Sequence, residues 1–231
     1  MKKIGIIGTG NMGRTIGLSL ARKGYEVFFG GRDLSKAAFA ASFDNTTKFG
    51  SNQEAAEFGD IIYYSPRDIH PKNVINNLSA LKGKVVIESS NWNLSSKLEP
   101  EKINISKAEI LQHQLPEAMV VKAFNTIIQE VFEYTIKDID EYTVTCFIAS
   151  NFEDAIKQVS KIVYDLGFKP EVCGNIKQAL LLEEIGSLIR ILARLKKTPW
   201  LSLSVSELPI IEDLQFGGRT PSILHGPKDF N

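Results

Sequence analysis

The chain has 231 residues, of which 43% are hydrophobic and 23% charged, and its 27 basic residues balance its 27 acidic ones. This composition is typical of a soluble globular protein with one large domain, or one large and one small, and a core of its own. It offers no basic excess for nucleic acid or a membrane surface, and no stretch is long enough to span a bilayer. The two cysteines, Cys146 and Cys173, lack metal-ligand spacing. We therefore expect no metal site and a cytoplasmic location.

The first thirty residues carry the strongest signal for a nucleotide site. Residues 4–7 form a short apolar run typical of a buried parallel strand. Gly8, Gly10 and Gly13 follow with Gly-x-Gly-x-x-Gly spacing, and residues 11–23 predict a helix. In this arrangement the first glycine permits a tight turn, the second leaves room for a pyrophosphate, and the third lets the helix lie close to the sheet. The helix N-terminus then offers N–H groups to the phosphates. The alternative is a glycine-rich turn with no ligand.

The end of the second predicted strand, residues 25–29, indicates which nucleotide binds. In NAD-binding versions of this unit an acidic residue there bonds the ribose 2′-hydroxyl. Here the strand runs into two glycines and Arg32, with Lys36 one helical turn further on. A guanidinium forms paired hydrogen bonds to a phosphate, so the sequence favours NADP over NAD. Asp33 is either a displaced ribose-binding acid or the N-cap of the next helix.

The rest of the chain alternates strands and helices, which predicts an α/β, Rossmann-type doubly wound parallel sheet with helices on both faces. Serine–glutamate capping pairs are expected at Ser51/Glu54, Ser106/Glu109 and Ser150/Glu153. We expect a polar connection over 44–50. The further strands are predicted at 60–64, 84–88, 118–124 and 143–149, the last of these being the final strand. The further helices are predicted at 34–42, 52–58, 71–81, 107–112 and 151–166.

Residues 177–197 predict a long helix whose apolar side chains cover more than one face. Such a helix needs cover on most sides, from the core, a ligand or a partner. We expect a homodimer with this helix in or beside the interface, the alternative being ordinary core packing. Beyond residue 198 the chain is rich in Pro, Gly and Ser, which predicts an extended tail. The expected domains are a nucleotide-binding domain over 1–174 and a C-terminal helix and tail over 175–231, serving dimerisation or covering the acceptor site.

The segment 120–126, Val-Val-Lys-Ala-Phe-Asn-Thr, resembles a signature of the coenzyme F420-dependent NADP oxidoreductase family. The Gly8–Gly13 opening and the Gly30-Gly31-Arg32 end of the second strand are similar too. The same domain forms the cytosolic part of six-transmembrane metalloreductases. The resemblance covers roughly residues 3–185. It implies a domain that binds NADP(H) and passes hydride to a deazaflavin or flavin, with coenzyme F420, FMN or FAD as the small-molecule acceptor.

The resemblance also implies roles for individual residues. The usual Ser or Thr before the arginine is Gly31 here, which removes one phosphate bond, and the usual Pro-Ala after Asn-Thr-Ile is Ile128-Gln129. Cofactor binding therefore transfers better than acceptor identity. The implied pyrophosphate contacts are Thr9, Gly10, Asn11 and Met12; the 2′-phosphate contacts are Arg32 and Lys36; the cofactor lining after the 60–64 strand is Ser65, Pro66 and Arg67; and the residues facing the nicotinamide and acceptor ring are Ala123, Phe124, Asn125 and Thr126.

Hydride transfer between two bound rings needs orientation and a dry site more than a side-chain acid, so we assign no catalytic residue. His70, His113 and His225 are candidates for a proton donor. The alternative for each is an ordinary surface histidine with no role in the reaction. Trp92 follows the 84–88 strand at the edge where ligands bind, so it either stacks on a ring or packs in the core.

Three functions remain open from the sequence. The first is an NADPH-dependent reductase of a flavin or deazaflavin. The second is an imine reductase similar to pyrroline-5-carboxylate reductase, although the segment after Gly174 looks too short for that family's helical dimerisation domain. The third is a non-catalytic NADP-binding sensor. Turnover of NADPH with any acceptor separates the first two from the third.

Overall fold

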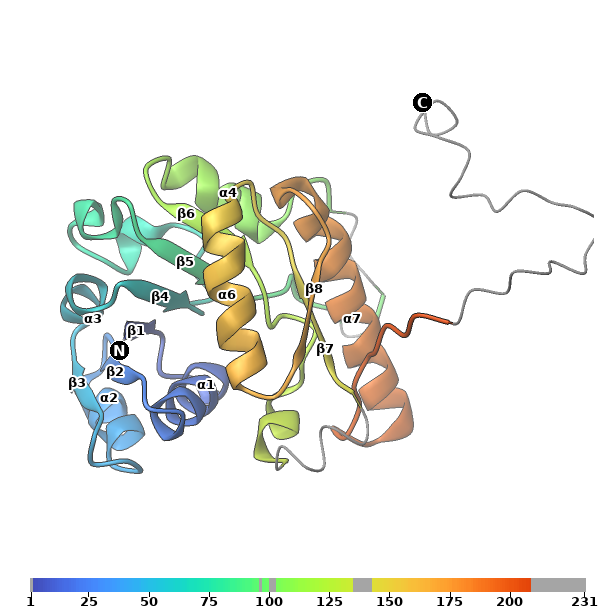
Figure 1. The fold of residues 1–231 in the computed structure, drawn as a ribbon, viewed down its shortest axis with the longest axis horizontal. Helices are drawn as coiled ribbons and strands as arrows, with labels where there is room; N and C mark the ends of the chain where they lie inside the picture. The colour runs from blue at the N-terminus through green and yellow to red at the C-terminus, as the bar shows by residue number, and fades with distance from the viewer. Residues whose placement is uncertain (1, 96, 100–102, 135–142, 209–231) are drawn as a thin grey trace, which may run out of the picture.

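The computed structural model describes residues 2–95, 97–99, 103–134 and 143–208. Its centre is a parallel six-stranded sheet with the order β3-β2-β1-β4-β5-β6 (Figure 1). The order reverses between β1 and β4, which is the switch point where ligands bind in open α/β sheets. The predicted Rossmann-type fold is therefore confirmed. The strands are β1 Lys3–Ile7, β2 Glu26–Gly30, β3 Lys48–Gly50, β4 Ile61–Tyr64, β5 Val85–Glu88 and β6 Met119–Lys122.

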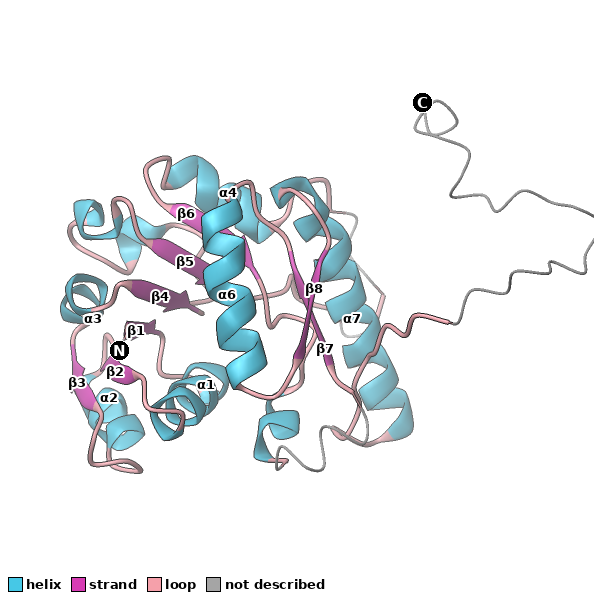
Figure 2. Cartoon of the chain, in the orientation of Figure 1, coloured by secondary structure: helices cyan, strands magenta, loops and turns pink. Residues whose placement is uncertain are grey.

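Helices cover both faces of this sheet, as Figure 2 shows in cyan against the magenta strands. The helices α1 (Asn11–Arg22) and α6 (Glu153–Asp165) bury their apolar stripes in one core cluster. The helices α3 (Asn52–Phe58) and α4 (Lys107–Gln114) contribute to the cluster on the opposite face. A further helix, α2 (Leu34–Ala41), connects β2 to β3. This is the doubly wound arrangement predicted from the alternation of strands and helices.

Two of the three predicted capping boxes are confirmed. Ser51 caps α3 and Ser106 caps α4, each with the glutamate three residues later bonded back to the cap. The third prediction is wrong, because the residue at the N-cap of α6 is Phe152 and no side chain caps that helix. The Ser150 hydroxyl instead donates to the carbonyl of Val120, 2.7 Å away, which ties this loop to β6.

The predicted helix over 71–81 is wrong. The segment forms two short 3₁₀ turns, Pro71–Asn73 and Leu78–Leu81, with an irregular stretch between them. The Asn77 side chain accepts a hydrogen bond from the backbone of Ser79, which starts the second turn. Asparagine competes with helical hydrogen bonds in this way. The predicted connection at 44–50 is also more ordered than expected, since its last three residues form β3.

A second, two-stranded parallel sheet follows the first. Its strands are β7 (Thr145–Ile148) and β8 (Lys169–Val172), so the strand predicted at 143–149 is present but is not the last. The strand β8 was not predicted because it contains Pro170 and two charged residues, and proline is uncommon inside strands. One antiparallel bridge between Lys122 and Ala149 joins this sheet to β6.

The C-terminal helix α7 (Ala179–Lys196) follows a 3₁₀ turn at Ile176–Gln178. It contacts α4 and lies beside β7 and β8 in Figure 1. The tail predicted beyond it is described only to residue 208, and positions 209–231 lie outside the described residues. Within the described part of the chain, no helix combines the length and the apolar character needed to cross a bilayer.

Candidate functional site

The glycine loop between β1 and α1 lies at the switch point of the sheet. Gly8 has a φ of +97°, a conformation that L side chains rarely adopt. A Cβ atom on Gly13 would lie 2.0 Å from the carbonyl oxygen of Gly8, so this glycine is required for close packing. A Cβ atom on Gly10 would meet no atom within 4 Å. The loop therefore needs Gly13 for its fold, whereas Gly10 leaves space beside the backbone.

The N-terminus of α1 is available to an anion. Gly10 is its N-cap and makes no side-chain capping bond, and no acidic residue lies in the first turn. The N–H groups of Asn11 and Met12 therefore face a position that suits a phosphate. Thr9 and Met12 are partly buried, while Gly10 and Asn11 are exposed.

The loop after β4 lies directly against the glycine loop. The Ser65 hydroxyl donates to the carbonyl of Gly8 at 3.2 Å, and Ser65 and Pro66 are half-buried while Arg67 is exposed. Parallel neighbours β1 and β4 end at the same edge, which explains this contact. The structure thus brings together two of the segments that the family resemblance implies, Gly8–Gly13 and Ser65–Arg67.

The end of β2 presents two exposed cations, Arg32 and Lys36. The side chain of Asp33 accepts from the backbone of Ser35 at 3.0 Å and is the N-cap of α2, so the capping role considered from the sequence is confirmed. Gly31 is tightly enclosed, because a Cβ atom there would lie 3.0 Å from the Asp33 carbonyl and 3.3 Å from the Thr9 hydroxyl. The local packing thus accommodates a glycine where the resembling family has a larger residue.

Arg32 also acts across the edge on the loop after β4. A hydrogen bond from the backbone of His70 and another from Asn73 hold the pKa of Asp68 below its usual value, and the Arg32 charge adds to this effect. The charge at the end of β2 therefore acts on the segment that follows β4. A 2′-phosphate beside Arg32 would share this edge with the glycine loop.

The segment after β6 has an unusual backbone. Phe124 has a φ of +62°, which is rare for a residue with a bulky side chain. Its backbone N–H donates to the sulfur of Cys146 at 3.4 Å, and its ring packs against Tyr63 and Phe132. Strained residues of this kind cluster at ligand sites, and this one lies at the carboxyl edge of the sheet.

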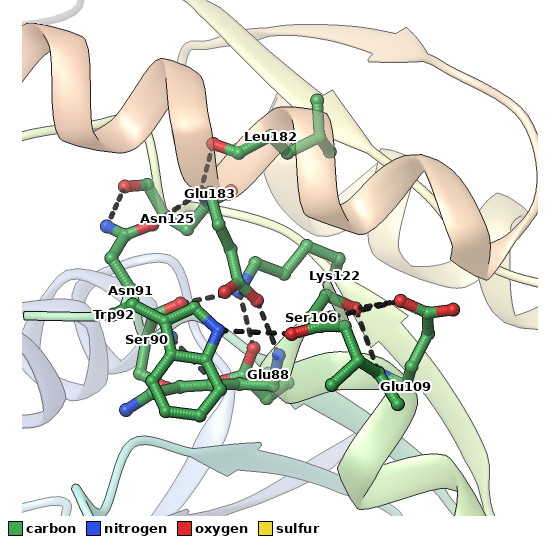
Figure 3. A network of polar contacts seen from close by, with 12 residues as sticks. Glu88, Ser90, Asn91, Trp92, Ser106, Glu109, Lys122, Asn125, Leu182 and Glu183 are labelled. Carbon is green, nitrogen blue, oxygen red and sulfur yellow. Dashed lines mark hydrogen bonds and ion pairs between the residues drawn. The ribbon is translucent and has the colours of Figure 1, made fainter. Parts of the chain in front are cut away.

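The four residues predicted to face the rings, Ala123 to Thr126, have buried side chains. The Asn125 amide nitrogen donates to Asn91 Oδ1 at 2.8 Å and to the Leu182 carbonyl at 2.7 Å, while the Asn91 amide donates to the Asn125 carbonyl (Figure 3). These bonds fix the orientation of the amide group. The Asn125 Oδ1 and Thr126 Oγ1 atoms are buried and have no hydrogen-bond partner within the described residues. Their contact with a nicotinamide stays a prediction.

A buried ion cluster next to this amide pair was not predicted from the sequence. Lys122 Nζ lies 2.6 Å from Glu88 Oε2 and 2.7 Å from Glu183 Oε1, and all three side chains are at most 3% exposed (Figure 3). The cluster connects the ends of β5 and β6 to α7. One available signal was a lysine inside an apolar strand, since buried charges are rare unless paired.

Trp92 is fixed at the same edge. Its indole nitrogen donates to the carbonyl of Ile105 at 3.2 Å, and the ammonium of Lys107 lies 5.1 Å from the centre of its ring. The guanidinium of Arg190 donates to the Trp92 carbonyl at 2.7 Å. A cation thus lies over the indole, which limits the stacking role considered for this residue.

The structure does not place the candidate proton-donor histidines together in one site. His70 and His113 are exposed, and a ring nitrogen of His70 lies 3.3 Å from the side-chain oxygen of Gln114. His225 lies outside the described residues. No role in the reaction follows from these positions.

Comparisons with known proteins agree with this geometry. The family model for NADP oxidoreductase, coenzyme F420-dependent, matches residues 3–92. The F420-dependent NADP reductase of Methanothermobacter marburgensis is 29% identical over 206 residues, covering 81% of this chain and 90% of the relative. The metalloreductase STEAP2 of Mus musculus is 28% identical over 182 residues, covering 79% of this chain but 35% of the relative, so this chain spans about a third of that protein's length.

A solved structure supports the fold. The crystal structure of a putative F420-dependent NADP reductase from Arthrobacter sp. FB24 matches with a TM-score of 0.78 at 20% identity, covering 90% of this chain and 100% of that chain. Together with the family match, this confirms the resemblance stated from the sequence motifs. Residues 3–92 are thus similar to the NADP oxidoreductase, coenzyme F420-dependent, family, and the relatives named above match most of the chain at 28–29% identity.

Proposed function

We propose that this protein is an NADP(H)-dependent oxidoreductase that transfers hydride to a deazaflavin or flavin acceptor. The observation that carries the proposal is the glycine loop at the switch point, where Gly10 leaves the α1 N-terminus open to a pyrophosphate. Arg32 at the end of β2 supplies the charge that favours a 2′-phosphate. Coenzyme F420 is the acceptor favoured by the names of the relatives, and FMN and FAD are the other candidates.

The protein would act by binding and orientation. The backbone of the glycine loop would hold the pyrophosphate, and the nicotinamide would extend toward the carboxyl ends of β4, β5 and β6. NADPH supplies the hydride. The loop after β4, with Ser65 to Arg67, and the segment Ala123 to Thr126 would hold the two rings face to face and exclude water, which is the main need of a hydride transfer.

Arg32→Glu is expected to test the cofactor choice. The change replaces a phosphate-binding cation by an anion, so NADPH should bind more weakly by about 2 kcal/mol or more, or roughly 30-fold, the scale of a lost charge-assisted hydrogen bond. NADH affinity should change far less. Both nucleotides are titrated by fluorescence against wild type, with Lys23→Glu as a matched charge reversal at the exposed C-terminal end of α1, away from the glycine loop. Equal losses for the two nucleotides in Arg32→Glu would remove Arg32 from the 2′-phosphate site.

The acceptor is identified by a panel. NADPH oxidation is followed with F420, FMN, FAD, ferric chelates and pyrroline-5-carboxylate side by side. Turnover with the imine alone would favour the imine reductase alternative. Tight NADPH binding with no turnover on any acceptor would favour the sensor alternative.

We also propose a homodimer built on the exposed face of α7. Leu181, Leu188 and Leu195 are each at least 50% exposed and are spaced seven residues apart. The half-buried Ile185 and Leu192 lie between them, giving the alternating spacing of four and three that forms a coiled-coil seam. An antiparallel pair keeps the basic ends of the two helices, rich in arginine and lysine, away from each other. A second copy therefore fits this seam.

Leu188→Glu at the middle of the seam is expected to convert the dimer to a monomer, because it buries two carboxylates against each other at the two-fold axis. Light scattering of wild type should give twice the mass of one chain. Arg194→Glu, an exposed change off the seam, should remain dimeric. A monomeric wild type at micromolar concentration, or a dimeric Leu188→Glu, would remove α7 from the interface.

A further inference from the structure

One carboxylate oxygen of the buried ion cluster accepts no hydrogen bond within the described residues. The ammonium of Lys122 donates hydrogen bonds to Glu88 Oε2, the Ser90 carbonyl and Glu183 Oε1. The other carboxylate oxygen of Glu88, Oε1, accepts from the backbone and hydroxyl of Ser90. Glu183 Oε1 accepts a second bond, from the backbone N–H of Lys107 at 2.8 Å. Glu183 Oε2 is buried and has no partner within the described residues.

The charges of the cluster do not balance if both acids are ionised. Two carboxylates would then share one ammonium, in side chains that are 0% to 3% exposed. Two further cations act on Glu183 through space without an ion pair to it: the Lys107 ammonium lies over Trp92, and the Arg190 guanidinium bonds to the carbonyls of Gly186 and Trp92 and the hydroxyl of Ser187. An unpaired buried charge is costly, and such a group takes up a proton instead.

The structure distinguishes which acid holds that proton. Both oxygens of Glu88 accept hydrogen bonds, Oε2 from Lys122 and Oε1 from Ser90, whereas one oxygen of Glu183 accepts none within the described residues. Glu183 has a free oxygen, and burial raises its pKa, with the Lys122 charge opposing and the Glu88 charge reinforcing this effect. A proton on Glu183 Oε2 leaves every existing bond of the cluster in place.

We propose that Glu183 is a proton-linked positioning residue, neutral in the working protein, that holds α7 against the carboxyl edge and thereby fixes Asn125. The neighbouring carbonyl, that of Leu182, accepts from the Asn125 amide, and Gly186 one turn on lies against Asn91, where a Cβ atom would be 2.4 Å from Asn91 Oδ1. Loss of the Glu183 proton would set a second negative charge beside Glu88 and loosen this contact. The inference about Asn125 as part of the acceptor site rests on the proposed function.

The experiment compares wild type with Glu183→Gln, which keeps the shape and cannot ionise. The infrared carboxylic-acid C=O band of the folded protein at neutral pH is expected in wild type and lost in Glu183→Gln. The matched control is Glu184→Gln, the exposed neighbour, which should keep the band. Its persistence in Glu183→Gln, or its absence from wild type, would overturn the protonated state.

A second readout tests positioning. With the acceptor that proves active, wild-type kcat should fall several-fold as pH rises, whereas Glu183→Gln should lack that fall; the Kd of NADPH should be the same in both. Identical pH profiles would overturn the positioning role.

If no acceptor is turned over, the proposed function fails, while the protonation of Glu183 is still tested by the infrared band and by thermal unfolding. Because the folded pKa of Glu183 is raised, wild type should lose stability relative to Glu183→Gln as pH rises from the unfolded pKa to the folded one, and a constant difference would contradict it.

Discussion

Lys122→Met is expected to lower the free energy of unfolding by about 3–5 kcal/mol, the usual result of removing one partner from a buried ion pair. The variant leaves Glu88 without its cation at the end of β5, where its side chain is 3% exposed. It also removes the bond that joins β6 to Glu183 on α7. Urea or thermal unfolding measures the loss directly.

The control for this prediction is an exposed pair of the same kind. Lys82 and Glu117 are 2.5 Å apart, but their side chains are 66% and 62% exposed. Lys82→Met should therefore cost less than about 1 kcal/mol, because solvent screens surface pairs. Replacing Lys122, Glu88 and Glu183 together by methionine and leucines should recover much of the loss, since no buried charge remains. A cost below 1 kcal/mol for Lys122→Met alone would mean that water reaches the cluster.

The regular part of the fold follows from short-range sequence rules. The strand before Gly8, the helix after it and the capping boxes at Ser51 and Ser106 each depend on residues within a few positions of one another. The prediction of a capping box at Ser150 was wrong because the bond that this side chain makes depends on a residue distant in the sequence. The hydroxyl of Ser150 bonds across the fold to Val120 rather than to its own helix, and such a choice depends on a partner 30 residues away.

The candidate site divides in the same way. The spacing of Gly8, Gly10 and Gly13 predicts the loop, and its packing explains each position. The ion cluster is different, because Lys122 and Glu183 are 61 residues apart and only the folded chain brings them together. The Val-Val-Lys-Ala-Phe-Asn-Thr motif therefore has two parts. Its lysine and asparagine anchor α7 to the sheet, and its strained phenylalanine shapes the edge that we propose receives the nicotinamide.

Gly10→Val is expected to abolish nucleotide binding while leaving the fold intact. A Cβ atom at this position meets no protein atom within 4 Å, so the side chain extends into the space that we assign to the pyrophosphate. The lost bonds are several charge-assisted ones, each worth about 1.5–3 kcal/mol. NADPH affinity should therefore fall by at least about 100-fold, which corresponds to roughly 3 kcal/mol. Fluorescence titration of NADPH and thermal unfolding are measured on the same sample.

Gly13→Ala separates this effect from simple misfolding. Its methyl group would lie 2.0 Å from the backbone carbonyl of Gly8, a contact that only movement of α1 away from β1 can relieve. This variant should lose stability, whereas Gly10→Val should unfold at the wild-type temperature. The contrast arises because Gly13 packs against the protein, whereas Gly10 faces the open space that we assign to the pyrophosphate. Normal NADPH binding by a folded Gly10→Val would place the pyrophosphate elsewhere and leave the glycine loop as a structural turn.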